Sequence, residues 1–189
     1  MSGVADDGEC APRGAVLLIV DMVSDWQFPD AEALLAGARA VAPAIAALKR
    51  RCRERGVPVI YANDNQGRWR SDFRAVVQSS LGGAGADITR TLMPGDEDYF
   101  LLKPRHSAFF ATPLELLLQA LQARRLVLAG VSSDQCILNT AVDARMRDYE
   151  VEVPRDCVAT QGDERQAWVL KHFGEALNVP TPPSSGLRL

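Results

Sequence analysis

The sequence predicts an α/β fold of three layers (α/β/α), with a mostly parallel, Rossmann-like sheet of about six strands between two layers of helices. Two observations support this prediction. Short apolar runs alternate along the chain with longer stretches of helical periodicity, which is the pattern of successive βα units. The first run, Val16–Val20, is wholly apolar and rich in β-branched residues, which is typical of a strand buried on both faces.

The first helix is predicted over Ala31–Arg55. Gly56 is a natural end for it, and Pro43 is expected to kink the helix or split it in two, because proline lacks the backbone donor. Apolar residues recur through this stretch at helical spacing, at Leu34, Leu35, Ala38, Val41, Ala42, Ile45, Leu48 and Cys52.

A second strand is predicted at Val57–Ala62, where an apolar run is closed by the turn-forming residues Asn63–Asn65. The next helix is predicted at Trp69–Leu81. Three glycines in the four residues 82–85 then predict a flexible loop.

The middle of the chain repeats the pattern. Tyr99–Leu102 is predicted as the third strand, and Lys103 follows it directly. Thr112–Glu115 combines an N-cap residue, a proline at the first helical position and a capping-box glutamate, so a helix begins there and runs to about Ala123. Leu126–Ala129 is the fourth predicted strand.

The last third of the chain supplies the remaining elements. Ile137–Tyr149 has helical spacing of its apolar residues and is followed by a fifth strand at Glu150–Val153. A final helix is predicted at Asp163–Leu177, with an added edge strand at Asn178–Thr181. We therefore expect one domain over residues 14–181, with flexible tails at 1–13 and 182–189 on composition.

Bulk properties exclude several classes of function. The net charge of −3 and the pI near 5.4 give no electrostatic footprint for nucleic acid or a membrane surface. No uninterrupted apolar run approaches the ~20 residues of a membrane span, and the polar N-terminus does not resemble a signal peptide. Four scattered cysteines indicate reduced thiols in a cytoplasmic protein, at positions Cys10, Cys52, Cys136 and Cys157.

Polar residues follow the predicted strands. Asp21, Asn63, Asp64, Lys103 and Ser132 all come just after an apolar run. Right-handed crossovers bring the carboxyl ends of parallel strands to one edge of the sheet, and ligands bind outside that edge. This edge is therefore the predicted site.

Three of the residues at this edge suggest nucleophilic catalysis. Cys136 directly precedes a predicted helix, whose N-terminal dipole would lower the pKa of the thiol. Asp21 could act as a general base, and Lys103 could stabilise a thiolate. Each also has a plain structural interpretation, as a buried cysteine, a turn-capping aspartate and a solvated surface lysine.

Three segments resemble the motifs of isochorismatase-like hydrolases. Leu17–Trp26 (LLIVDMVSDW) is similar to the family's opening motif, and Lys103–Leu114 (KPRHSAFFATPL) is similar to its lysine motif. Ala129–Cys136 (AGVSSDQC) resembles the cysteine motif, and Asp156 stands where the family has an aspartate after the fifth strand. The resemblance covers roughly residues 15–181.

The resemblance implies a catalytic triad of Asp21, Lys103 and Cys136. It also implies a cis peptide bond between Val131 and Ser132, and an oxyanion hole formed by the N–H groups of Ser132 and Cys136. Nicotinamidase-like members carry a D-x-H metal motif, but Asp64 is followed here by Asn65 and Gln66. We therefore expect neither a metal nor any other cofactor.

The predicted function is cleavage of a C–N bond in a small amide, carbamoyl or ureido compound through a thioester. The alternatives are an isochorismatase-type vinyl-ether hydrolase, a catalytically silent binding or assembly member, and a redox-sensing thiol. The resemblance also implies a homo-oligomer. Arg68, Arg70 or Arg105 could receive a substrate carboxylate. The remaining substrate-binding candidates are Trp26, Asn63, Asp64, Trp69, Phe73, Phe110 and Val131.

Overall fold

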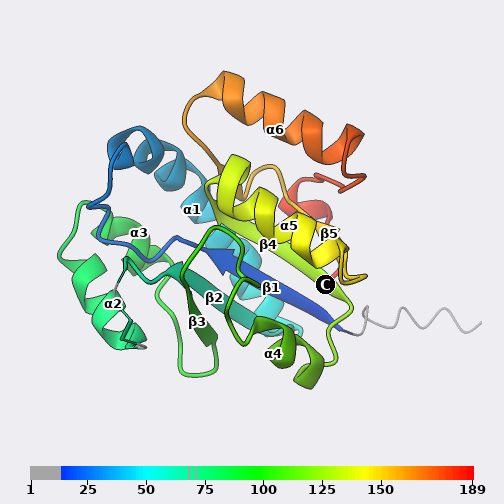
Figure 1. The fold of residues 1–189 in the computed structure, drawn as a ribbon, viewed down its shortest axis with the longest axis horizontal. Coiled ribbons are helices and arrows are strands. Elements are labelled where there is room, and N and C mark those ends of the chain that lie inside the picture. The colour runs from blue at the N-terminus through cyan, green and yellow to red at the C-terminus, as the bar shows by residue number, and fades with distance from the viewer. Residues whose placement is uncertain (1–13, 68, 71) are drawn as a thin grey trace, which may run out of the picture.

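A computed structural model describes residues 14–67, 69–70 and 72–189, and its centre is a six-stranded sheet (Figure 1). The strand order is β3-β2-β1-β4-β5, with β6 also paired to β4, and all these pairings are parallel. The predicted parallel sheet is thereby confirmed. The strands are β1 (Ala15–Val20), β2 (Val59–Asp64), β3 (Tyr99–Lys103), β4 (Arg125–Val131), β5 (Glu150–Glu152) and β6 (Val158–Ala159).

Helices cover both faces of the sheet and complete the three layers (Figure 1). Side chains alternate between the faces along β1: Leu17 and Ile19 pack with α1 and α3, whereas Leu18 packs with α4, α5 and α6. The helices are α1 (Ala31–Glu54), α2 (Phe73–Leu81), α3 (Ala86–Thr91), α4 (Leu114–Ala120), α5 (Leu138–Arg145) and α6 (Asp163–Glu175). A π-helical turn, η1 (Ser133–Ile137), precedes α5, and a 3₁₀ turn, η2 (Ser184–Gly186), lies near the C-terminus.

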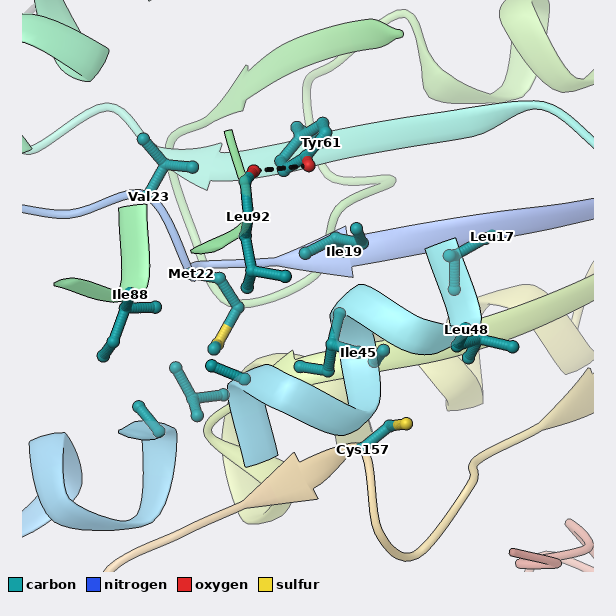
Figure 2. Close-up of a cluster of buried hydrophobic side chains, with 14 of the residues drawn as sticks. Leu17, Ile19, Met22, Val23, Ile45, Leu48, Tyr61, Ile88, Leu92 and Cys157 are labelled. Atoms are coloured by element: carbon teal, nitrogen blue, oxygen red, sulfur yellow. Dashed lines mark hydrogen bonds between the residues drawn. The ribbon is translucent and has the colours of Figure 1, made fainter. Parts of the chain in front are cut away.

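The core beneath α1 contains a buried polar network as well as apolar side chains. Figure 2 shows Ile45 and the neighbouring side chains of this layer, with the Tyr61 hydroxyl donating to the Leu92 carbonyl over 2.6 Å. Lys49 Nζ lies 2.6 Å from the Tyr61 hydroxyl and 2.8 Å from Asp98 Oδ2. These bonds fasten α1 to β2 and to the loop that leads into β3.

Helix α1 runs through Pro43 and is not divided by it. Pro43 is exposed, so the backbone carbonyl that loses its partner faces solvent and can bond to water. By length and composition α1 could cross a membrane. It is not an uninterrupted apolar run, because charged residues such as Arg39 and Lys49 interrupt it. Its buried residues pack on the sheet, which accounts for its apolar composition.

Several boundaries differ from the sequence prediction. Helix α2 begins at Phe73 instead of Trp69, because the Asp72 carboxylate accepts a hydrogen bond from Ala75 N and caps the helix there. Helix α3 and strand β6 were not predicted, since each is too short to show a period. The segment 178–181 is not a strand, although Val153 N donates to the Pro180 carbonyl.

The expectation of a flexible tail over 182–189 is wrong. Leu187 and Leu189 are buried, and Arg51 donates to the carbonyl oxygens of Ser184 and Leu187. The Asp156 carboxylate accepts hydrogen bonds from both the backbone N–H and the hydroxyl of Ser184. The proline- and serine-rich composition of this segment suggested disorder, but its two leucines, Leu187 and Leu189, pack into the core. The predicted tail at 1–13 lies outside the described residues.

Candidate active site

The predicted site residues meet at the carboxyl ends of four adjacent strands. Asp21 follows β1, Asp64 ends β2, Lys103 ends β3, and Cys136 lies in the turn η1 after β4. These strands are neighbours in the sheet, so residues as far apart in the sequence as Asp21 and Cys136 come together. Topology alone produces this arrangement, as expected for an open parallel sheet.

Lys103 lies at the centre of the cluster. Its Nζ is 2.8 Å from Asp21 Oδ2 and 3.4 Å from Cys136 Sγ, and the side chain has no exposed area. Burial alone would lower the pKa of Lys103, but the neighbouring charges of Asp21 and Cys136 outweigh burial and raise it. Lys103 is therefore a permanent buried cation and not the solvated surface lysine of the structural interpretation.

Cys136 is held as a neutral thiol. Burial and the neighbouring Asp21 carboxylate raise its pKa to about 12, against the opposing effect of Lys103. The expectation that the helix dipole lowers this pKa is therefore wrong, because the sulfur sits in the π-helical turn before α5, beside a carboxylate. A third neighbour is the exposed His106, whose Nδ1 lies 3.8 Å from Sγ. Nucleophilic attack by this sulfur would therefore require a base to remove the thiol proton.

Asp21 is oriented by two bonds, one from each side. Oδ1 accepts the backbone N–H of Asp64 at 2.8 Å, while Oδ2 contacts Lys103. The backbone of Asp21 is in the left-handed region, with φ of 55°, so the chain turns sharply as it leaves β1. Gly130 on β4 allows the strands to approach here: a Cβ on it would lie 2.0 Å from the Val20 carbonyl oxygen.

The segment after β4 places two more predicted residues beside the thiol. The peptide bond between Val131 and Ser132 is cis. The Ser132 carbonyl accepts hydrogen bonds from Gln135 N and Ile137 N, which close the turn that carries Cys136.

A pocket of about 520 Å³ opens onto this cluster. Lys103 does not line it and lies beneath its floor, covered by the residues it contacts. Six predicted residues do line it: Asp21, Asn63, Asp64, Val131, Ser132 and Cys136.

Four predicted pocket walls lie elsewhere. Trp26 is buried against Gly85, where a Cβ would come within 1.9 Å of the indole nitrogen, and Phe73 is buried and stacked on Phe100 at 4.4 Å. Trp69 is 83% exposed and lines a separate hollow of about 300 Å³ beside β3. Phe110 is also exposed. Of these four aromatic residues, Trp26 and Phe73 are therefore packing partners in the core, and Trp69 and Phe110 lie at the surface outside this pocket.

The walls are formed instead by residues that the sequence analysis did not select. Phe28 supplies an apolar wall, and Asp25 is buried with hydrogen bonds from Gln66 Nε2 and the Ser79 hydroxyl. Asp25 lies in the opening motif, which is the one signal that could have marked it. Ser24 lies in the same motif, and Gln135 lies in the cysteine motif and in the turn η1. Gln27 and Gln66 are in irregular segments outside the three motifs.

The model of the isochorismatase domain matches residues 15–182 of this sequence. The chain belongs to the isochorismatase family. Its sequence is 40% identical over 154 residues to the uncharacterized isochorismatase family protein YaaI of Bacillus subtilis, covering 82% of this chain and 85% of that protein. The family resemblance of the three motifs is confirmed.

Other relatives in the isochorismatase family carry more specific names. A probable inactive nicotinamidase of Arabidopsis thaliana is 35% identical over 182 residues, covering 89% of this chain and 93% of that protein. A maleamate amidohydrolase of Pseudomonas putida is 30% identical over 154 residues, covering 77% and 72%. The chain is an isochorismatase-family hydrolase by this relationship.

Solved structures agree with the family assignment. An isochorismatase family protein from Desulfovibrio vulgaris superposes with a TM-score of 0.72 and 25% identity, covering 92% of this chain and 95% of that one. The isochorismatase-family fold of the present chain is therefore the three-layer architecture described above.

This isochorismatase-family member does not have the residues for the metal site of nicotinamidase-like relatives. Asp64 is followed by Asn65 and Gln66, so the D-x-H motif is not formed. Across the described parts of the chain, no three His, Cys, Asp or Glu residues are grouped to hold a metal ion. The available donors at the pocket are carboxylates, amides and the thiol.

Proposed function

We propose that this chain is a cysteine hydrolase that cleaves the C–N bond of a small amide, carbamoyl or ureido compound without a cofactor. One observation carries the proposal: a fully buried lysine ammonium contacts both a carboxylate and a thiol at the edge of a pocket. The cysteine favours amide cleavage, since a nucleophile that forms a thioester suits an acyl carbon bonded to nitrogen.

The reaction begins when the Asp21 carboxylate takes the thiol proton as Cys136 Sγ attacks the carbonyl carbon. Lys103 stabilises the developing thiolate and keeps Asp21 oriented. The negative charge on the substrate oxygen is received by the backbone N–H groups of Ser132 and Cys136.

Collapse of the tetrahedral intermediate breaks the C–N bond, and Asp21 returns the proton to the leaving nitrogen. This releases ammonia or an amine and leaves an acyl thioester on Cys136. Water then attacks the thioester with Asp21 as base, and the acid leaves as the thiol recovers its proton.

The test is an ammonia-release screen over small amides, combined with intact mass spectrometry to detect the acyl adduct. Cys136→Ala should lose at least about a thousandfold in turnover. Cys52→Ala is the matched control, because Cys52 is also a free thiol but lies near the C-terminal end of α1 and does not line the pocket. Equal activity of the two variants would refute the nucleophile assignment.

A silent member that binds without turnover is the second candidate, favoured by the relative named a probable inactive nicotinamidase. It predicts saturable binding in the pocket with no ammonia and no adduct on Cys136. A vinyl-ether hydrolase would instead release pyruvate from isochorismate and would tolerate Cys136→Ser. Calorimetric titration of ligands into the protein reads the first outcome, and a pyruvate assay with isochorismate as substrate reads the second.

A further inference from the structure

The charges around the pocket are unbalanced. Three carboxylates line it, those of Asp21, Asp25 and Asp64, whereas none of its described lining residues is a lysine, arginine or histidine. Lys103 beneath the floor supplies one positive charge, and that charge is already bonded to Asp21. The pocket therefore presents an excess of negative charge to whatever enters it.

Asn63 adds an acceptor without a partner. This residue lines the pocket, is 2% exposed, and its amide Nδ2 donates to the Val23 carbonyl at 2.7 Å. That bond fixes which end of the amide is nitrogen, so Oδ1 is the free end. In the described part of the protein, Asn63 Oδ1 has no hydrogen-bond partner, which is a costly state for a buried oxygen.

Asp64 stands next to Asn63 and is the most accessible of the three carboxylates. Its Oδ1 accepts the backbone N–H of Gln66 at 2.6 Å, which holds the carboxylate at the pocket mouth. Asp25 differs, because it is buried and already accepts hydrogen bonds from Gln66 and Ser79. The exposed carboxylate of Asp64 and the buried, unpartnered Oδ1 of Asn63 in the adjoining wall are together called the acceptor surface. Both atoms accept hydrogen bonds, so they favour a ligand that brings N–H donors.

We propose that the substrate is a neutral or cationic compound whose N–H donors face Asn63 and Asp64, and that substrates bearing a carboxylate are excluded. The inference rests on the proposed hydrolysis only for the identity of the cleaved amide. A carboxylate on the ligand would be repelled by Asp64 and Asp25, whereas an ammonium or a second amide would be attracted or bonded.

Three amides with one two-carbon chain test the charge preference. β-Alaninamide is cationic, succinamide is neutral and succinamate is anionic, and each has the same primary amide. We expect kcat/KM for the first two to exceed that of succinamate by at least about tenfold, with the cation preference shrinking as salt is added. A preference for succinamate would overturn the inference.

Binding to Cys136→Ala, measured by calorimetry, separates this inference from the proposed chemistry. If wild-type protein releases no ammonia, the hydrolase proposal fails, but tighter binding of β-alaninamide and succinamide than of succinamate still supports the acceptor surface. Binding of none of the three, or of succinamate most tightly, would refute it.

A substitution at Asp64 tests the residue assignment. Asp64→Asn keeps an oxygen for Gln66 N and should reduce the β-alaninamide to succinamate ratio by about tenfold. Asp134→Asn is the matched control, since Asp134 lies outside the pocket lining, and should keep the wild-type ratio. Arg68→Ala tests whether Arg68, which is outside the described residues, binds the carboxylate of succinamate. If the wild type prefers succinamate and this variant does not, recognition belongs to Arg68 and the acceptor surface is refuted.

Discussion

Replacing Asp21 with asparagine should make the resting thiol more acidic while it destroys turnover. The pKa of Cys136 is raised to about 12 from an ordinary 9.0 by burial and by the Asp21 carboxylate, against the opposing effect of Lys103. That difference corresponds to roughly a thousandfold lower thiolate fraction below pH 9. Asp21→Asn removes the carboxylate and leaves the ammonium, so the pKa should fall by at least about one unit.

The assay is the rate of alkylation of Cys136 by iodoacetamide as a function of pH, followed by peptide mass spectrometry. The midpoint of the pH profile decides the matter, because a thiolate of lower pKa is also less nucleophilic. Turnover should fall by about a hundredfold to ten-thousandfold in the same variant, since the thiol proton has no acceptor.

Asp25→Asn is the matched control for this experiment. Asp25 also lines the pocket, but its carboxylate accepts hydrogen bonds from Gln27 N, Gln66 and Ser79. It is not among the causes that shift the pKa of Cys136. Its alkylation midpoint should stay near that of the wild type. A midpoint in Asp21→Asn equal to or above the wild-type value would show that Asp21 does not hold the thiol neutral.

Three further predictions concern stability. Leu187→Ala should lower the free energy of unfolding by about 2 kcal/mol or more in urea titrations, because Leu187 is buried. Leu116→Ala is the control and should lower it by less than about 0.5 kcal/mol, because Leu116 is exposed. Equal effects of the two substitutions would mean that the C-terminal segment is not packed. Lys49→Met should lower the free energy of unfolding by about 2 kcal/mol, because the buried Asp98 carboxylate then keeps only Arg53 as an ion-pair partner. Lys171→Met removes an ion pair whose side chains are 70% exposed and should leave the free energy of unfolding unchanged. The pKa values of the buried thiols are raised to about 11 for Cys52 and about 12 for Cys136 and Cys157. Above pH 9 an unfolded chain loses thiol protons that the folded chain keeps, so the free energy of unfolding should fall by up to about 1.4 kcal/mol per pH unit for each thiol. A free energy of unfolding that does not change with pH above 9 would contradict the raised pKa values.

The layers and the cluster of Asp21, Lys103 and Cys136 were predictable because they depend on strong signals. Buried strands such as Val16–Val20 have an unbroken apolar pattern, and the ends of parallel strands meet whatever the loops do. Asp21, Lys103 and Cys136 lie at such ends, so their convergence followed from topology together with the family motifs.

The pocket walls were not predictable from the same reasoning. Phe28 and Gln66 come from irregular segments, and their positions depend on turns whose geometry has no period in the sequence. Trp26 and Phe73 misled because an aromatic side chain is equally suited to a pocket wall and to the core, and only the packing partners decide. Leu187 misled in the opposite direction, since its proline-rich surroundings suggested a tail.

Strand β3, which ends at Lys103, is an edge strand: it pairs with β2 on one side, and no strand of the described residues pairs with its other side. Local unfolding of this edge strand would move the Lys103 ammonium away from Asp21 and Cys136 while the core stays folded. On heating, enzymatic activity should therefore be lost several degrees below the melting temperature measured by circular dichroism. Activity would then report local unfolding of this edge strand before the whole domain unfolds.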